Sequence, residues 1–214
     1  MSVQWFRRMG DIPGLDYEPP VAVNRSQLAN SELVPEVHSH DIDGRLHESL
    51  WWRYPEHGKY GGTSSSPAHQ FAFGEVAAEL ATATLLKRLW EGLELPGEPP
   101  DYHFAIQGVA GALWGRRRQE PEVLAWLEYL SWLDIRLIRA WPDAARNEYA
   151  SADPGSAEFY SVPGFSRLID IYSREGFLEE ALGVARLASE FGQGEEAVVD
   201  LEGRLALLRA EDGY

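Results

Sequence analysis

The chain has 214 residues, no cysteine, and 34 acidic against 19 basic residues, which gives a net charge of −15. The absence of cysteine excludes disulfides, thiolate zinc sites and cysteine nucleophiles. The negative charge argues against a nucleic-acid partner, and we interpret the basic cluster Arg116–Arg118 as the solvated end of a helix.

No run approaches the roughly 18 uncharged apolar residues of a membrane-spanning helix, so we expect no membrane partner. The first residues contain two arginines but no apolar segment after them, which is not the pattern of a secretory signal. These features, together with the missing cysteines, predict a location in the cytoplasm.

Residues 1–66 are predicted to form an irregular N-terminal arm that is rich in proline and glycine. The region has no sustained hydrophobic periodicity, and several prolines interrupt it. One short helix near Arg45–Arg53 is the regular element that we expect here. The tract Gly58–Ser66, GKYGGTSSS, is interpreted as a linker.

This arm also contains most of the histidines of the chain. If the segment is extended, His38 and His40 share one face, with Asp41, Asp43 and His47 within reach. Imidazole and carboxylate groups together suit zinc, manganese or iron, so a divalent metal is the one cofactor that the sequence suggests. The alternative is a polar surface loop whose histidines bind nothing.

Residues 67–214 are predicted to form one helical domain. Ser66 and Pro67 suit the N-cap and the first position of a helix that extends to about Leu93. Further helices are expected over residues 101–114 and 121–140, and the latter is apolar nearly all round, which is typical of a central core helix.

The segment Phe165–Gly192 predicts two antiparallel helices joined by a turn at Gly176. Large residues recur at three- and four-residue steps along the first helix, and alanines recur along the second, so the two can approach closely. A closing helix with a polar outer surface is expected over residues 195–210. The predicted class is all-α, either a helical bundle or a short α-solenoid of antiparallel helix pairs.

Residues 165–193 resemble one tetratricopeptide repeat, a 34-residue helix-turn-helix unit. The resemblance is carried by Phe165, Leu168, Tyr172, Gly176, Ala181 and Ala188. The sequence departs from the pattern at Ile169, Ala185 and Gln193.

The resemblance implies protein or peptide binding on the inner surface of the first helix, at Ser166, Asp170, Ser173 and Arg174. In the alternative interpretation, Asp170 and Arg174 form only an exposed ion pair between positions four apart.

The expected function is therefore an adaptor or scaffold that binds another protein or a peptide through a helical-repeat surface. One alternative is an acidic inhibitor or immunity-type protein that covers a basic enzyme. Another is a metal-dependent hydrolase that uses His38, His40 and His47. Catalytic residues are not identified, because serine lacks the G-x-S-x-G context and the abundant carboxylates form no specific pattern.

Overall fold

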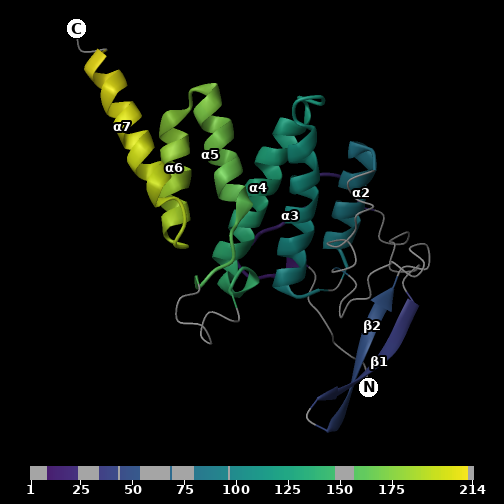
Figure 1. Cartoon of the computed structure of the whole chain (residues 1–214). Coiled ribbons are helices and arrows are strands. Elements are labelled where there is room, and N and C mark those ends of the chain that lie inside the picture. Colours follow the sequence, from purple (N-terminus) through teal and green to yellow (C-terminus); the bar gives the residue numbers. More distant parts are fainter. Residues whose placement is uncertain are drawn as a thin grey trace.

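The computed structural model describes residues 9–23, 34–42, 44–53, 68, 80–95, 97–147 and 157–211. Most of this part is helical, and the helices stand in a row with α2 at one end and α7 at the other (Figure 1). The bounds are α2 (Thr82–Leu93), α3 (Pro99–Arg116), α4 (Val123–Ala140), α5 (Pro163–Glu175), α6 (Leu178–Ser189) and α7 (Glu195–Glu211). Short 3-10 helices occupy Met9–Asp11 and Pro142–Ala144.

The predicted helical class and its packed helix pairs are confirmed. The helix expected over residues 67–93 is observed from Thr82 to Leu93. Leu80 and Ala81 before it are not helical, and the predicted start at Ser66 and Pro67 lies outside the described residues. A tertiary contact holds the chain at the start of α2. Arg116, at the end of α3, donates one hydrogen bond to the Leu80 carbonyl and another to the Thr82 hydroxyl.

A β-hairpin is the exception to the helical class, and it corrects the short helix expected near Arg45–Arg53. Strands β1 (Val34–Ile42) and β2 (Arg45–Arg53) pair antiparallel, from Val34 opposite Arg53 to Ile42 opposite Arg45. Gly44 has a φ of 76°, a conformation that glycine adopts at little cost. Its N–H donates to Asp41 Oδ1 at 2.8 Å, which stabilises the tight turn between the strands.

The main hydrophobic core lies where α2, α3, α4 and α5 meet, and α4 is its centre as predicted. Leu127, Leu130, Leu133 and Leu137 of α4 are fully buried. A second, smaller cluster joins α6 to α7 through residues of both helices. Its buried members are Leu178, Ala181, Leu182, Ala185, Leu201 and Leu205.

Helices α5 and α6 form an antiparallel pair that places α5 between α4 and α6 (Figure 1). Gly176 ends α5 in the left-handed conformation, with a φ of 85°. Tyr172 is half-buried, and its hydroxyl accepts a hydrogen bond from Trp132 Nε1 of α4 at 2.9 Å and donates one to Glu128. The α5–α6 pair is therefore anchored to the core of the molecule.

Candidate functional site

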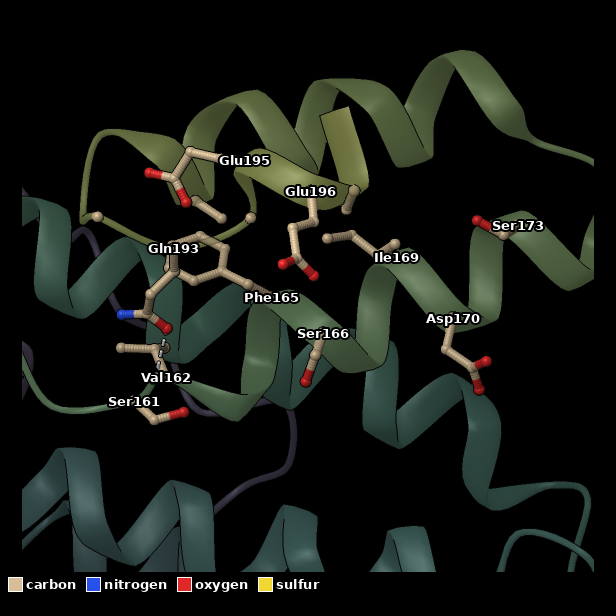
Figure 2. A pocket seen from close by; sticks show the side chains of 14 residues that line it. Ser161, Val162, Phe165, Ser166, Ile169, Asp170, Ser173, Gln193, Glu195 and Glu196 are labelled. Carbon is tan, nitrogen blue, oxygen red and sulfur yellow. Dashed lines mark hydrogen bonds between the residues drawn. The ribbon is translucent and has the colours of Figure 1, made fainter. Parts of the chain in front are cut away.

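A groove of about 680 Å³ lies between α5 and the first turn of α7. Its apolar floor comes from Phe165 and Ile169 of α5, Ala188 of α6 and Ala197 of α7. Figure 2 shows Glu196 reaching from the start of α7 toward α5, while Asp170 and Ser173 lie further along α5. The two walls thus come from α5 and α7, which are separated in the chain by α6.

The α6–α7 turn sets the width of the groove. Gly192 and Gly194 both adopt positive φ, at 66° and 90°. A Cβ on Gly194 would lie 2.9 Å from the Ala185 carbonyl oxygen and 2.9 Å from the Ala188 Cβ, so glycine is needed for this close packing. The tight turn brings the acidic start of α7 beside the apolar residues of α5.

Gln193 ties this turn to the segment that precedes α5. Its Oε1 accepts the N–H of Val162 at 3.0 Å, and its Nε2 donates to the Tyr160 carbonyl at 3.1 Å. The first of these bonds is drawn in Figure 2. One amide side chain therefore holds together two segments that are about thirty residues apart in the chain.

Replacement of Gln193 by alanine is expected to lower the free energy of unfolding by about 1–3 kcal/mol, because it removes two hydrogen bonds and leaves the part-buried Val162 N–H without its partner. Urea unfolding followed by circular dichroism measures the change. Gln119→Ala is the matched control, since that side chain is exposed after α3. Equal midpoints for the two variants would contradict the structural role of Gln193.

Three of the four binding residues predicted from the sequence, Ser166, Asp170 and Ser173, line this groove. Arg174 lies outside the lining and pairs with Asp170, with 2.8 Å between Nε and Oδ1. The Ser166 hydroxyl donates to the Pro163 carbonyl at 3.1 Å, which leaves its lone pairs available to accept from a ligand.

Carboxylates dominate the polar lining. Asp170, Glu195 and Glu196 border the groove, and none of the described residues that line it is basic. A second hollow of about 390 Å³ shares Ser161, Gly192 and Gln193 with the first, so the two are contiguous.

This second hollow repeats the chemistry of the first. It contains the aromatic rings of Phe159 and Phe191 and the carboxylates of Glu158 and Glu190. The two rings meet edge to face with centroids 5.3 Å apart, which makes a rigid apolar surface. Arg146 lies 3.6 Å from Glu158, so this carboxylate is partly neutralised.

Sequence reasoning missed Gln193, Glu195 and Glu196 as part of the site. The signal was present in the segment Gly192–Glu196, GQGEE, where two glycines flank a polar residue and an acidic pair opens a helix. That pattern predicts a tight turn and a helix start, but it does not say which helix the turn faces.

The metal site predicted at His38, His40, Asp41 and His47 falls on the hairpin. The backbone register places His40 opposite His47, whereas the side chains of all three histidines lie outside the described residues. Asp41 is exposed and accepts the Gly44 N–H. Within the described part of the chain, no three His, Asp or Glu residues are grouped as a metal site would require.

The sixth histidine, His103, forms a polar cluster inside the helical core that sequence reasoning also missed. His103 and Asp134 are 0% and 2% exposed, and their Nδ1 and Oδ1 atoms are 2.6 Å apart. Gln107 Nε2 lies 2.9 Å from the other ring nitrogen. These partners fit an imidazole that donates through Nδ1 and accepts through Nε2.

Arg167 of α5 adds a positive charge to this cluster, near the Asp134 carboxylate. Burial lowers the pKa of Arg167, and the nearby Asp134 carboxylate opposes that shift. Since both nitrogens of His103 are engaged and the ring is fully buried, the cluster connects α3, α4 and α5 and offers no surface to a ligand.

Comparisons with protein-family models, with curated proteins and with solved structures find no match to this chain. The site is therefore interpreted from its own geometry and charge. Among the helices of the described ranges, none has the length and apolar character needed to cross a membrane.

Proposed function

We propose that this chain is a protein-interaction module that binds an extended, basic segment of a partner protein in the groove between α5 and the start of α7. The observation that carries the proposal is the combination of an apolar floor with the carboxylates of Asp170, Glu195 and Glu196. Such a surface can bury the aliphatic stem of a lysine or arginine while the carboxylates bind its charged end.

The contiguous second hollow favours an extended peptide over a single small molecule. Glu158 and Glu190 offer a second acidic position beyond Gln193, beside the rings of Phe159 and Phe191. A segment with two basic side chains, separated by residues that cross Gln193, would use both positions. The net charge of −15 would accelerate the encounter with such a segment.

The resemblance of residues 165–193 to a tetratricopeptide repeat supports the same surface. It places ligand contacts on the first helix of the pair, which is α5, and Ser166, Asp170 and Ser173 of that helix line the groove. The proposed role is therefore that of an adaptor, and its location in the cytoplasm is part of this proposal.

Selection from a random dodecapeptide display library tests the proposal. We expect lysine or arginine next to apolar residues in the selected peptides. Glu196→Gln should weaken binding of a selected peptide about 10-fold or more, since a hydrogen bond to a charged group contributes roughly 1.5–3 kcal/mol. Isothermal titration calorimetry measures the affinities. Glu122→Gln removes the same charge from an exposed position outside the groove and should leave binding unchanged.

Arg174→Ala is expected to change the peptide affinity in the opposite direction to Glu196→Gln. Because Arg174 neutralises Asp170, its removal should strengthen binding of the same basic peptide by a few fold. The proposal fails if the selected peptides lack basic residues, or if Glu196→Gln and Glu122→Gln weaken binding equally. If the library yields no peptide, and the protein instead binds a folded basic enzyme tightly and with strong salt dependence, the result would favour the alternative function of an acidic inhibitor.

A further inference from the structure

Helix α7 lies at the end of the row of helices and packs against α6 (Figure 1). Leu201 and Leu205 are buried in this contact, and Ala197 and Val198 are partly buried beside them. An outer helix of this kind normally presents charged residues on the opposite side, where it meets solvent.

Beyond its first turn, which carries Glu195 and Glu196, the opposite side of α7 is apolar. Positions two apart on a helix differ by about 200°, so Val199 and Gly203 point away from the side that carries Leu201 and Leu205. Val199 and Leu207 are 73% and 68% exposed. Together with three small residues of the same side, these two residues form an apolar stripe that we call the outer stripe. It consists of Val199, Gly203, Ala206, Leu207 and Ala210. The polar outer surface expected for this helix is therefore interrupted by an exposed apolar stripe, although the charged residues of α7 up to Arg209 are exposed as predicted.

The charges of α7 are divided along the helix, and two of them, Glu202 and Arg209, also pair with Arg186 and Glu179 of α6. The first half, residues 195–202, carries Glu195, Glu196, Asp200 and Glu202 and no basic residue. The second half, residues 203–211, carries Arg204 and Arg209 against Glu211. Arg204 and Arg209 are 44% and 70% exposed, so both remain accessible although each has an intramolecular carboxylate partner.

This division makes the helix complementary to itself in one direction only. An antiparallel copy places each acidic half beside the basic half of the other, and it also opposes the two helix dipoles. A parallel copy places acid beside acid. Charge and apolar pattern therefore favour the same occupant, a second copy of this helix turned end for end.

We propose that the outer stripe of α7 binds the outer stripe of a second copy of this chain, antiparallel about a twofold axis at Gly203. Val199 and Leu207 each lie four residues from Gly203, so each packs against the other in the partner copy, as an isologous interface requires. A Cβ on Gly203 would meet nothing within 4 Å, so this position is open to the close approach of a second helix.

The interface is small. A helix of 17 residues is about 25 Å long, and one such pair covers less than the roughly 800 Å² per partner of a standard interface. The dimer should consequently depend on concentration, with a dissociation constant on the order of tens of micromolar. It would carry two peptide grooves, one per copy.

The cysteine-free chain allows a direct test of the pairing and its direction. The full-length protein with Gly203→Cys, oxidised mildly at about 100 μM, should form a disulfide-linked dimer, since the two Cα atoms at the axis come within bonding reach. Val199→Cys alone should stay unlinked, whereas a mixture of Val199→Cys and Leu207→Cys should give the mixed dimer. Ala125→Cys, at an exposed position of α4, measures random collision.

Sedimentation equilibrium supplies an independent readout. Wild-type protein should pass from monomer to dimer as its concentration rises, and Leu207→Glu should remain monomeric with an unchanged circular dichroism spectrum. Ala125→Glu should dimerise like wild type. A wild-type protein that is monomeric at every concentration overturns the proposal, and so does a Val199→Cys variant that links to itself as well as Gly203→Cys does. If Leu207→Glu does not fold, the cysteine experiment still decides.

Discussion

Replacement of Asp134 by alanine is expected to lower the free energy of unfolding by about 3–5 kcal/mol, because the buried Asp134 carboxylate is both the acceptor for the His103 imidazole and the counter-charge of Arg167. The carboxylate is 2% exposed and accepts a hydrogen bond from His103, and it also interacts electrostatically with the guanidinium group of Arg167. Alanine would leave the Nδ1 proton of His103 without an acceptor in a site that water does not reach, and would remove the counter-charge of Arg167.

Chemical unfolding in urea, followed by circular dichroism and fluorescence, measures this loss. Asp170→Ala is the matched control, because Asp170 is also in an ion pair on a helix but lies at the surface, where such a pair contributes only about 0.3–0.5 kcal/mol. Asp134→Asn should fall between the two, since its amide oxygen can still accept from His103 but carries no charge for Arg167.

The double replacement His103→Leu with Asp134→Leu extends the test. It should cost less than Asp134→Ala, since exchange of both partners for apolar groups leaves no unpaired donor between them. If Asp134→Ala unfolds at the midpoint of wild type, the cluster does not connect α3, α4 and α5 in the way described. Within the described residues, Asp134 Oδ2 has no hydrogen-bond partner, so the pairing with His103 is the contact under test.

The helical half of this fold could be predicted because its signals are local. The turn at Gly176, the alternation of large and small residues around it, and the proline-bounded helix over residues 121–140 all act within a few residues. Observed α5 and α6, Pro163–Glu175 and Leu178–Ser189, differ from the expected pair by two or three residues at their outer ends. Helix α7 also begins at the residue predicted for it.

The hairpin was missed although one strong signal for it is present. The sequence Asp43-Gly44, between two runs of about nine residues, is a typical signal for a two-residue hairpin turn. Proline and three histidines in those runs obscure the period-two pattern, which is why the sequence predicts an irregular arm here. The start of α2 at Thr82 is different in kind. It depends on Arg116, which is 36 residues away in the chain, and no local rule predicts such a contact.

The candidate site shows the same division between local and tertiary information. Ser166, Asp170 and Ser173, which line the groove, were implied by the resemblance to a tetratricopeptide repeat, whereas the ion pair between Asp170 and Arg174 followed from helical spacing. Glu195 and Glu196 could not be assigned to the site from the sequence, since their position beside α5 depends on the direction that the Gly192–Gly194 turn gives to the start of α7. His103 illustrates the limit for the core, because its partner lies 31 positions away on another helix.

Replacement of Leu168 by alanine is the second large effect that we expect, a loss of about 2–5 kcal/mol. Leu168 is fully buried on α5 in the main core, and α5 lies between α4 and α6. The cavity left by the Cγ methine and the two methyl groups therefore has little freedom to collapse. The loss should appear as a lower urea midpoint with an unchanged denaturant slope.

Two further variants separate this effect from a general sensitivity to mutation. Ala181→Leu adds volume at a fully buried position of α6, and overpacking at this position should cost about 1–3 kcal/mol. Leu46→Ala makes the same truncation as Leu168→Ala on a side chain that is 70% exposed in β2, and it should change stability by less than about 0.5 kcal/mol. Since the groove has α5 as one wall, Leu168→Ala should also weaken peptide binding, whereas Leu46→Ala should not. Midpoints equal to wild type for both core variants would show that α5 and α6 do not pack as described.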